Sequence, residues 1–153
     1  MASTELPFVD EHSIAIDAAA DVAWSALVLV VSAAFAGRRT ERVAGLLGCE
    51  QRAATGVAGE VGSTIPGFRV ADARAPEVLV LEGRHRYSTY ALTLRIDCDG
   101  DGSRLRAETR AEFPGWTGRA YRTVVIGSRG HVVVVRRLLR SVKHRAERSG
   151  AEP

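Results

Sequence analysis

The chain has 153 residues, of which 46% are hydrophobic and 25% are charged, and this excludes a disordered, collagen-like or coiled-coil protein. Its net charge of +3 does not indicate nucleic-acid binding, because basic and acidic residues alternate through most of the chain. Lys143 is the only lysine, and this arginine bias is typical of a high-GC bacterium. The length predicts one domain over residues 1–153.

The first predicted elements are a strand and two helices. Residues 8–17 alternate in hydrophobicity, with Phe8 sharing one face with the later isoleucines, as in a half-buried strand. A helix with apolar residues at helical spacing follows, and Asp17 or Asp21 is the expected N-cap. A second, short helix is expected from Thr40 to residue 47, with Thr40 as its candidate N-cap.

The middle of the chain predicts a run of antiparallel strands. These strands are expected over residues 51–55, 61–73, 78–81, 87–97 and 103–113. Glu82-Gly83-Arg84 is expected to turn or bulge the sheet, and Asp99-Gly-Asp-Gly102 has the composition of a hairpin turn. In the last strand apolar residues alternate with arginine and glutamate, so one face of the sheet is expected to lie in water.

A long helix is predicted over residues 117–148, after Pro114-Gly115 ends the sheet. Its apolar stripe is Tyr121, Val125, Ser128, Val132, Val135, Leu139, Val142 and Ala146. The four valines at 132–135 have low helix propensity and leave a strand as a local alternative. The element order predicts an α+β class: a curved antiparallel sheet of about six strands wrapped around the C-terminal helix, with two short helices after the first strand.

Three segments resemble the START-like superfamily, also called SRPBCC. They run from Ile16 to Leu27 (IDAAADVAWSAL), from Gly62 to Val70 (GSTIPGFRV) and from Val78 to Gly83 (VLVLEG). The superfamily shares a helix-grip fold and includes the birch-pollen allergen, polyketide cyclases and lipid-transfer domains. The resemblance covers nearly the whole chain. It departs at Ala19, where the family often has proline, and at a glycine pair, Gly127 and Gly130, which is expected to kink or thin the long helix.

The resemblance implies a cavity between the long helix and the concave sheet that holds an apolar small molecule. We expect a non-catalytic binding role for a lipid, polyketide or aromatic ligand. One alternative is an enzyme of the polyketide cyclase or dehydratase type. Another is an interaction module that uses the basic end of the long helix.

Nine residues are candidates for contacting the ligand. They are Phe68, Arg86, Ser88, Tyr90, Thr109, Tyr121, Val125, Ser128 and Val132. By strand alternation, Arg86, Ser88 and Tyr90 share the face expected to point inward, where a buried arginine needs an acidic partner or ligand. The alternative for Arg86 is a place at the rim, paired with Glu82. For the helix residues the alternative is plain core packing.

His85 is a candidate general base because imidazole titrates near neutral pH, and for an enzyme the candidate acid/base groups are His85, Tyr90 or Arg86. His131 is expected either in the cavity or on the flank of the long helix. The sequence has no phosphate loop, metal-binding spacing or Ser/His/Asp order above chance. No catalytic residue, cofactor or metal is therefore assigned.

Cys49 and Cys98 lie far apart in the sequence and form no metal-binding pattern. Residues 1–11 lack the basic start of a secretory signal, and the mostly apolar, uncharged stretch of residues 22–36 is shorter than the about 20 apolar residues of a membrane span. We expect a cytoplasmic protein with no nucleic-acid partner and no stable membrane insertion. A homodimer is compatible with the sequence.

Overall fold

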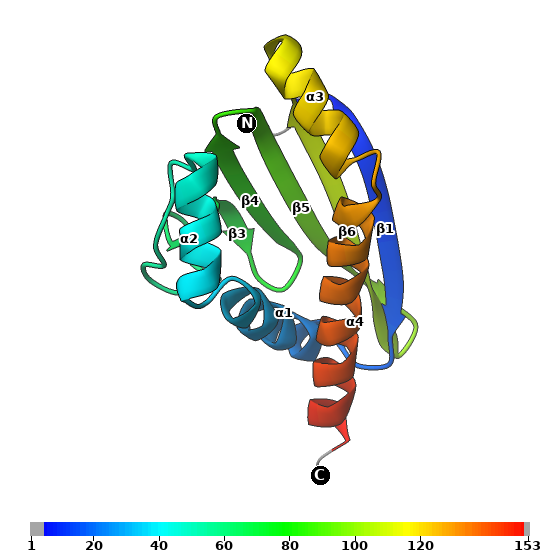
Figure 1. The fold of residues 1–153 in the computed structure, drawn as a ribbon. Helices are drawn as coiled ribbons and strands as arrows, with labels where there is room; N and C mark the ends of the chain where they lie inside the picture. Colours follow the sequence, from blue (N-terminus) through cyan, green and yellow to red (C-terminus); the bar gives the residue numbers. More distant parts are fainter. Residues whose placement is uncertain (1–4, 152–153) are drawn as a thin grey trace.

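The computed structural model describes residues 5–151 and has the predicted α+β architecture (Figure 1). The strands are β1 (Phe8–Ile16), β2 (Thr64–Ile65), β3 (Phe68–Arg74), β4 (Val78–His85), β5 (Ser88–Asp99) and β6 (Gly102–Glu112). The helices are α1 (Ala20–Ala34), α2 (Arg38–Leu47), α3 (Gly115–Val125) and α4 (Gly130–Gly150).

The six strands form one antiparallel sheet in the order β1-β6-β5-β4-β3-β2. The long hairpin of β5 and β6 closes between Asp99 and Gly102, and Gly100 supplies the positive φ of 63° that such a tight turn requires. This confirms the predicted Asp-Gly turn. Because β1 pairs with β6, the N-terminal strand lies beside the last strand and close to α4.

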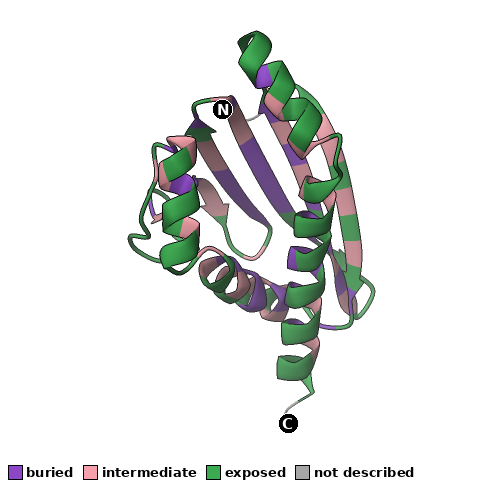
Figure 2. Cartoon of the chain, viewed as in Figure 1, coloured by how far each residue is buried: buried purple, intermediate pink, exposed green. Residues whose placement is uncertain are grey.

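Helices α1 and α4 cover the concave face of the sheet and cross each other near the β5–β6 turn (Figure 1). The buried residues of the two helices are Ala23, Ala26, Leu27 and Val31 of α1 and Val135, Leu138, Leu139, Val142 and Ala146 of α4. They pack against inner-face residues of the sheet such as Ile16, Leu94 and Leu105. Figure 2 shows this buried layer along β5 and at the crossing of the helices.

The pairing of β1 with β6 changes register between Phe8 and Asp10. An irregularity of this kind reverses the alternation of side chains along a strand. Phe8 is consequently 58% exposed, with the Arg110 guanidinium 5.9 Å from its ring centroid. The expectation that Phe8 shares a face with Ile14 and Ile16 is therefore wrong.

The helix predicted over residues 117–148 is two helices, α3 and α4, separated by a short break. A Cβ at Gly127 would lie 2.2 Å from the Thr123 carbonyl oxygen, and Arg129 has a left-handed φ of 57°. Glycine and left-handed backbone end an α-helix. The glycine pair therefore breaks the helix, which is more than the kink that was expected.

The N-caps of α1 and α2 are Ala19 and Gly37, and no side chain hydrogen-bonds to either helix start. Asp21 and Thr40 already lie inside the first turns, past the position from which a side chain caps a helix. Asp17 lies two residues before the N-cap of α1. The predicted capping roles of these three residues are wrong.

The predicted strands differ from the observed ones at three places. Residues 51–55 form only an isolated bridge, from Thr55 to Thr64. Pro66-Gly67 divides the next predicted strand into β2 and β3, since Gly67 has a φ of 90°. Glu82-Gly83-Arg84 stays paired with β5, so the turn or bulge expected there is wrong.

Within residues 5–151, no single helix combines the length and hydrophobicity needed to cross a bilayer. Helices α1 and α2 satisfy these criteria only when taken together, across a bend of 70°. The buried side chains of α1 pack against α4 and the sheet, which accounts for its apolar sequence.

Candidate functional site

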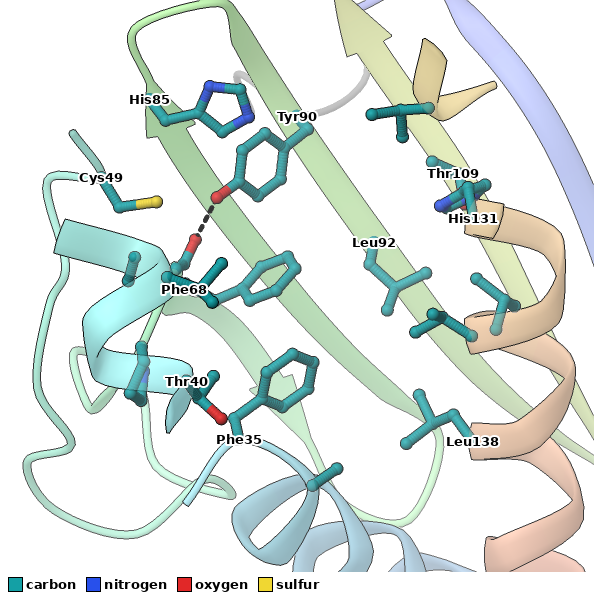
Figure 3. Close-up of a pocket in the computed structure, with 18 of the residues that line it drawn as sticks. Phe35, Thr40, Cys49, Phe68, His85, Tyr90, Leu92, Thr109, His131 and Leu138 are labelled. Atoms are coloured by element: carbon teal, nitrogen blue, oxygen red, sulfur yellow. Dashed lines mark hydrogen bonds between the residues drawn. The ribbon is translucent and has the colours of Figure 1, made fainter. Parts of the chain in front are cut away.

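A cleft of about 900 Å³ opens at the end of the sheet near the β4–β5 turn. The strands β5 and β6 form its floor, and the end of α1, α2, the start of β3, α3 and α4 form its sides (Figure 3). The apolar side chains that line it include Phe35, Val43, Leu47, Phe68, Leu92, Ala111, Phe113, Val125, Val135 and Leu138. This volume and lining are typical of a binding site for a small organic molecule.

Tyr90 of β5 is the polar anchor of one side of the cleft. Its hydroxyl donates to the Gly67 carbonyl oxygen at 2.5 Å, and its ring packs edge-on against Phe68 (Figure 3). Gly83 is its cross-strand partner, and a Cβ there would lie 2.4 Å from the Tyr90 ring and 2.1 Å from the Gly67 oxygen. The missing side chain therefore provides the space in which Tyr90 crosses β4.

His85 ends β4 and is buried behind Tyr90. The backbone N–H of Tyr87 donates to His85 Nδ1 at 3.1 Å, which assigns the proton of the neutral ring to Nε2. Nε2 lies 3.2 Å from Ser88 Oγ and donates to it. The Ser88 hydroxyl proton is then available to an acceptor in the cleft.

Aromatic rings join these groups into one continuous surface, here called the aromatic wall. The centroid distances are 5.2 Å from Phe35 to Phe68, 5.1 Å from Phe68 to Tyr90, 5.4 Å from Tyr90 to His85 and 5.0 Å from His85 to Tyr121. Tilted and edge-on pairs of this kind are favourable by about 0.5–1.5 kcal/mol each. The wall links α1, β3, β4, β5 and α3, so several parts of the fold determine its shape.

The titratable groups of this wall all favour their neutral forms. Burial lowers the pKa of His85 and raises the pKa of Tyr121. Burial, and then the neighbouring Cys49, raises the pKa of Tyr90 well above the usual tyrosine value. Burial also raises the pKa of the Cys49 thiol, which Tyr90 and Arg52 only partly offset. The wall therefore offers hydrogen-bonding groups without charge near pH 7.

A second polar group lies on the opposite side of the cleft, where β1, β6 and α4 meet. The Nε2 atom of His131 is 3.0 Å from Thr109 Oγ1 and 3.4 Å from Asp10 Oδ1. The other oxygen of Asp10 is 3.1 Å from His12 Nε2. Because Asp10 pairs with Thr109 in the sheet, the register of β1 and β6 places both against His131. A hydroxyl and a carboxylate thus orient this imidazole.

Six of the nine predicted ligand-contacting residues line the cleft: Phe68, Ser88, Tyr90, Thr109, Tyr121 and Val125. They come from β3, β5, β6 and α3, and the fold brings them together around one space. Whether they contact a ligand stays a prediction.

Arg86 does not line the cleft, contrary to the inward position that strand alternation implied. It lies exposed in the two-residue turn between β4 and β5, where strand alternation no longer applies. Its guanidinium carbon is 6.0 Å from the Tyr87 ring centroid. The pairing with Glu82 is also wrong, because the partner of that carboxylate is Arg69, at 3.6 Å.

Ser128 and Val132 also lie outside the cleft lining. Ser128 is exposed in the break between α3 and α4, where helical spacing is interrupted. In α4 the buried residues Val135, Leu139, Val142 and Ala146 keep the predicted stripe, but in the first turn His131 lines the cleft and Val132 does not. The stripe predicted for one unbroken helix is therefore wrong at these two positions.

The cleft also contains residues that were not among the nine candidates. Leu92 follows Tyr90 on the inner face of β5, so strand alternation would have identified it. Phe35 directly follows α1 and Leu138 lies on the buried side of α4, and neither gave a signal that separates cleft from core. Cys49 follows α2 in a loop, and only tertiary packing brings it beside Tyr90 (Figure 3).

The described residues contain no group of three or more His, Cys, Asp or Glu side chains placed to hold one metal ion. Cys49 is a buried free thiol and Cys98 an exposed one. The cleft can therefore orient a ligand through uncharged hydrogen-bonding groups, and His131 is its best-oriented candidate for moving a proton.

Comparison with solved structures identifies the fold. Truncated norcoclaurine synthase from Thalictrum flavum is 12% identical, with a TM-score of 0.56 over 97% of this chain and 98% of that chain. Protein CV1439 from Chromobacterium violaceum is 9% identical, with a TM-score of 0.56 over 90% and 96%. The Aha1 dimer from Colwellia psychrerythraea is 18% identical, with a TM-score of 0.53 over 90% and 94%. At these identities the similarity shows the fold alone.

Sequence comparison identifies the family. A search of curated proteins finds no match. The family model DUF2867, described as a protein of unknown function, matches residues 3–136, which is most of the chain. The chain therefore belongs to the DUF2867 family, and its fold is the helix-grip fold that the sequence resemblance implied.

Proposed function

We propose that this protein binds an apolar small molecule, such as a lipid, polyketide or aromatic compound, in the cleft without chemically changing it. The observation that carries the proposal is the cleft itself, about 900 Å³ in volume and lined by aliphatic and aromatic side chains. A bound apolar molecule removes this surface from water, which is favourable by roughly 25 cal/mol per Å².

The polar groups of the cleft support binding of an uncharged ligand body. Ser88 and Tyr90 on one side and Thr109 and His131 on the other face the same space. A few hydrogen-bonding groups in an apolar site orient a ligand, while the apolar surface supplies most of the affinity. The neutral forms favoured along the aromatic wall suit a ligand body without charge.

The proposal is tested with the fluorescent apolar probe N-phenyl-1-naphthylamine. Ala111 lies on the cleft floor, so Ala111→Phe fills the space, whereas Val133 is 64% exposed outside the cleft lining. We expect probe binding to wild type and to the control Val133→Phe, and at least about tenfold weaker binding to Ala111→Phe. Equal probe binding by the two variants, both folded by circular dichroism, would contradict the proposal.

A reaction of the cyclase or dehydratase type is the second candidate, and the orientation of His131 by Asp10 favours it. An imidazole fixed by a carboxylate is a suitable acid or base. The test follows a β-keto thioester, with His131→Gln as the variant and His144→Gln as the exposed control. Turnover lost only in His131→Gln supports catalysis, and no turnover by wild type rules out this reaction.

A further inference from the structure

One flank of α4 brings a row of polar residues to the cleft. Arg137, Ser141 and Arg145 all line it, and their spacing of four residues places them on the same side of the helix. The two arginines are eight residues apart, which is about 12 Å along the helix axis. Both are exposed, so the row lies at the mouth of the cleft and not in its floor.

These two arginines dominate the charge of the cleft. Apart from the histidines, they are the only ionisable cations or carboxylates among its lining residues within residues 5–151. No carboxylate in that range lies within 4.0 Å of either guanidinium. By contrast, Lys143 on the same helix is paired with Glu147 at 2.5 Å. The mouth therefore presents two cations that form no salt bridge with an acidic side chain of the described residues.

The rim on the side of α1 and α2 has the opposite character. Leu29 and Val43 line the cleft there, although they are 50% and 54% exposed. Exposed apolar side chains beside a pocket are typical of a surface that a ligand covers. The entrance thus has one apolar rim and one cationic rim.

We propose that the ligand is an amphipathic anion, whose apolar body lies along the aromatic wall and whose carboxylate or phosphate group binds Arg137 or Arg145 at the mouth. The inference rests on the proposed function and deepens it by naming the ligand class. Guanidinium groups bind carboxylate and phosphate oxygens through paired, charge-assisted hydrogen bonds. The uncharged aromatic wall would then bind the apolar end of the ligand, and the cationic mouth would bind its anionic end.

The test compares three ligands with the same alkyl chain: dodecanoate, dodecyl phosphate and dodecanol. Each displaces N-phenyl-1-naphthylamine from the full chain, below the concentration at which it forms micelles. Dodecanoate, dodecyl phosphate or both should bind at least about fivefold more tightly than dodecanol, and added salt should reduce the difference. The tighter of the two anions, dodecanoate or dodecyl phosphate, identifies whether the mouth prefers a carboxylate or a phosphate group.

The decisive variant is Arg137→Gln/Arg145→Gln. Its matched control is Arg136→Gln/Arg140→Gln, which removes the same charge from exposed positions of α4 outside the cleft lining. We expect the cleft variant to bind the anions about three- to tenfold more weakly and dodecanol unchanged. The control should keep the preference for anions.

Two results would overturn the inference while leaving the proposed function intact. One is equal binding of dodecanol and both anions by wild type. The other is an equal loss of anion binding in the cleft variant and its control, which would indicate general charge attraction. Failure of all three ligands and of the probe to bind would instead remove the proposed function, and the inference with it.

Discussion

The same strands, β5 and β6, form the hydrophobic core at one end of the sheet and the cleft at the other. Near the β5–β6 turn, Leu94 is fully buried beneath the crossing of α1 and α4. Near the β4–β5 turn, Tyr90 and Leu92 of the same strand line the cleft. Likewise Leu105 of β6 lies in the core, while Thr109 and Ala111 line the cleft.

The difference comes from the helices and not from the strands. Helix α1 packs across one end of the sheet only, and α2 stands at the edge of the other end (Figure 1). Helix α4 begins at Gly130, and before the break α3 contributes Tyr121 and Val125 to the cleft. A side chain on the inner face of the sheet therefore lies in the core where a helix packs directly over it. Where no helix covers it, the side chain lines the cleft.

The largest predicted effect is a difference in unfolding free energy between the variants Leu94→Ala and Leu92→Ala. Both changes remove the same atoms from the same face of β5. Leu94→Ala should lower the free energy of unfolding by about 2–5 kcal/mol, since it leaves a closed cavity in the core. Leu92→Ala should cost about 2 kcal/mol, the low end of that range, because Leu92 is buried but its loss enlarges a space that is already open. Urea unfolding measures both, and equal losses would contradict the distinction between the two ends.

A smaller effect is expected for Gly83→Ala, which tests how the cleft end is built. The new Cβ meets the Gly67 carbonyl oxygen and the Tyr90 ring at 2.1 and 2.4 Å, so the ring must move. We expect a loss of about 1–3 kcal/mol in unfolding free energy, together with weaker probe binding. Gly45→Ala is the control, because its Cβ meets nothing within 4 Å, and it should stabilise α2 by up to about 1 kcal/mol.

The smallest effect is a pH dependence confined to the cleft end. Burial lowers the pKa of His85 from 6.5, so the unfolded chain binds this proton more tightly than the folded chain. The stability associated with neutral His85 is complete above about pH 6.5 and is lost as pH falls through the folded-state pKa. Between pH 7.5 and 5, wild type should therefore lose more stability than His85→Gln, as measured by urea unfolding. His144→Gln, at an exposed site, should follow wild type.

The sequence predicts the strands well because each inner face shows in the alternation of residues. The pattern of Leu105, Ala107, Thr109 and Ala111 is visible without a structure, and Thr109 stands out in it as a hydroxyl. The same pattern does not separate cleft from core, because it carries no information on where α1 crosses the sheet. Sequence periodicity is local, whereas a hollow depends on packing between distant segments.

The misplaced site residues have local causes. Arg86 was assigned by alternation, but alternation ends at the turn that contains it. Ser128 and Val132 were assigned by the spacing of one unbroken helix, but Ser128 lies in the break that follows Gly127 and Val132 lies in the first turn after it. In each case the periodicity was extended across a point where the backbone changes direction. The glycines beside the break were the available signal.

The two cysteines give the molecule a built-in chemical reporter. Cys98 is exposed near the β5–β6 turn, and Cys49 is buried beside Tyr90 with a pKa raised by its surroundings. Because the thiolate is the reactive form, an alkylating reagent modifies Cys49 slowly while the loop after α2 stays closed. Alkylation of Cys49, timed against that of Cys98, therefore measures how often this side of the cleft opens to solvent.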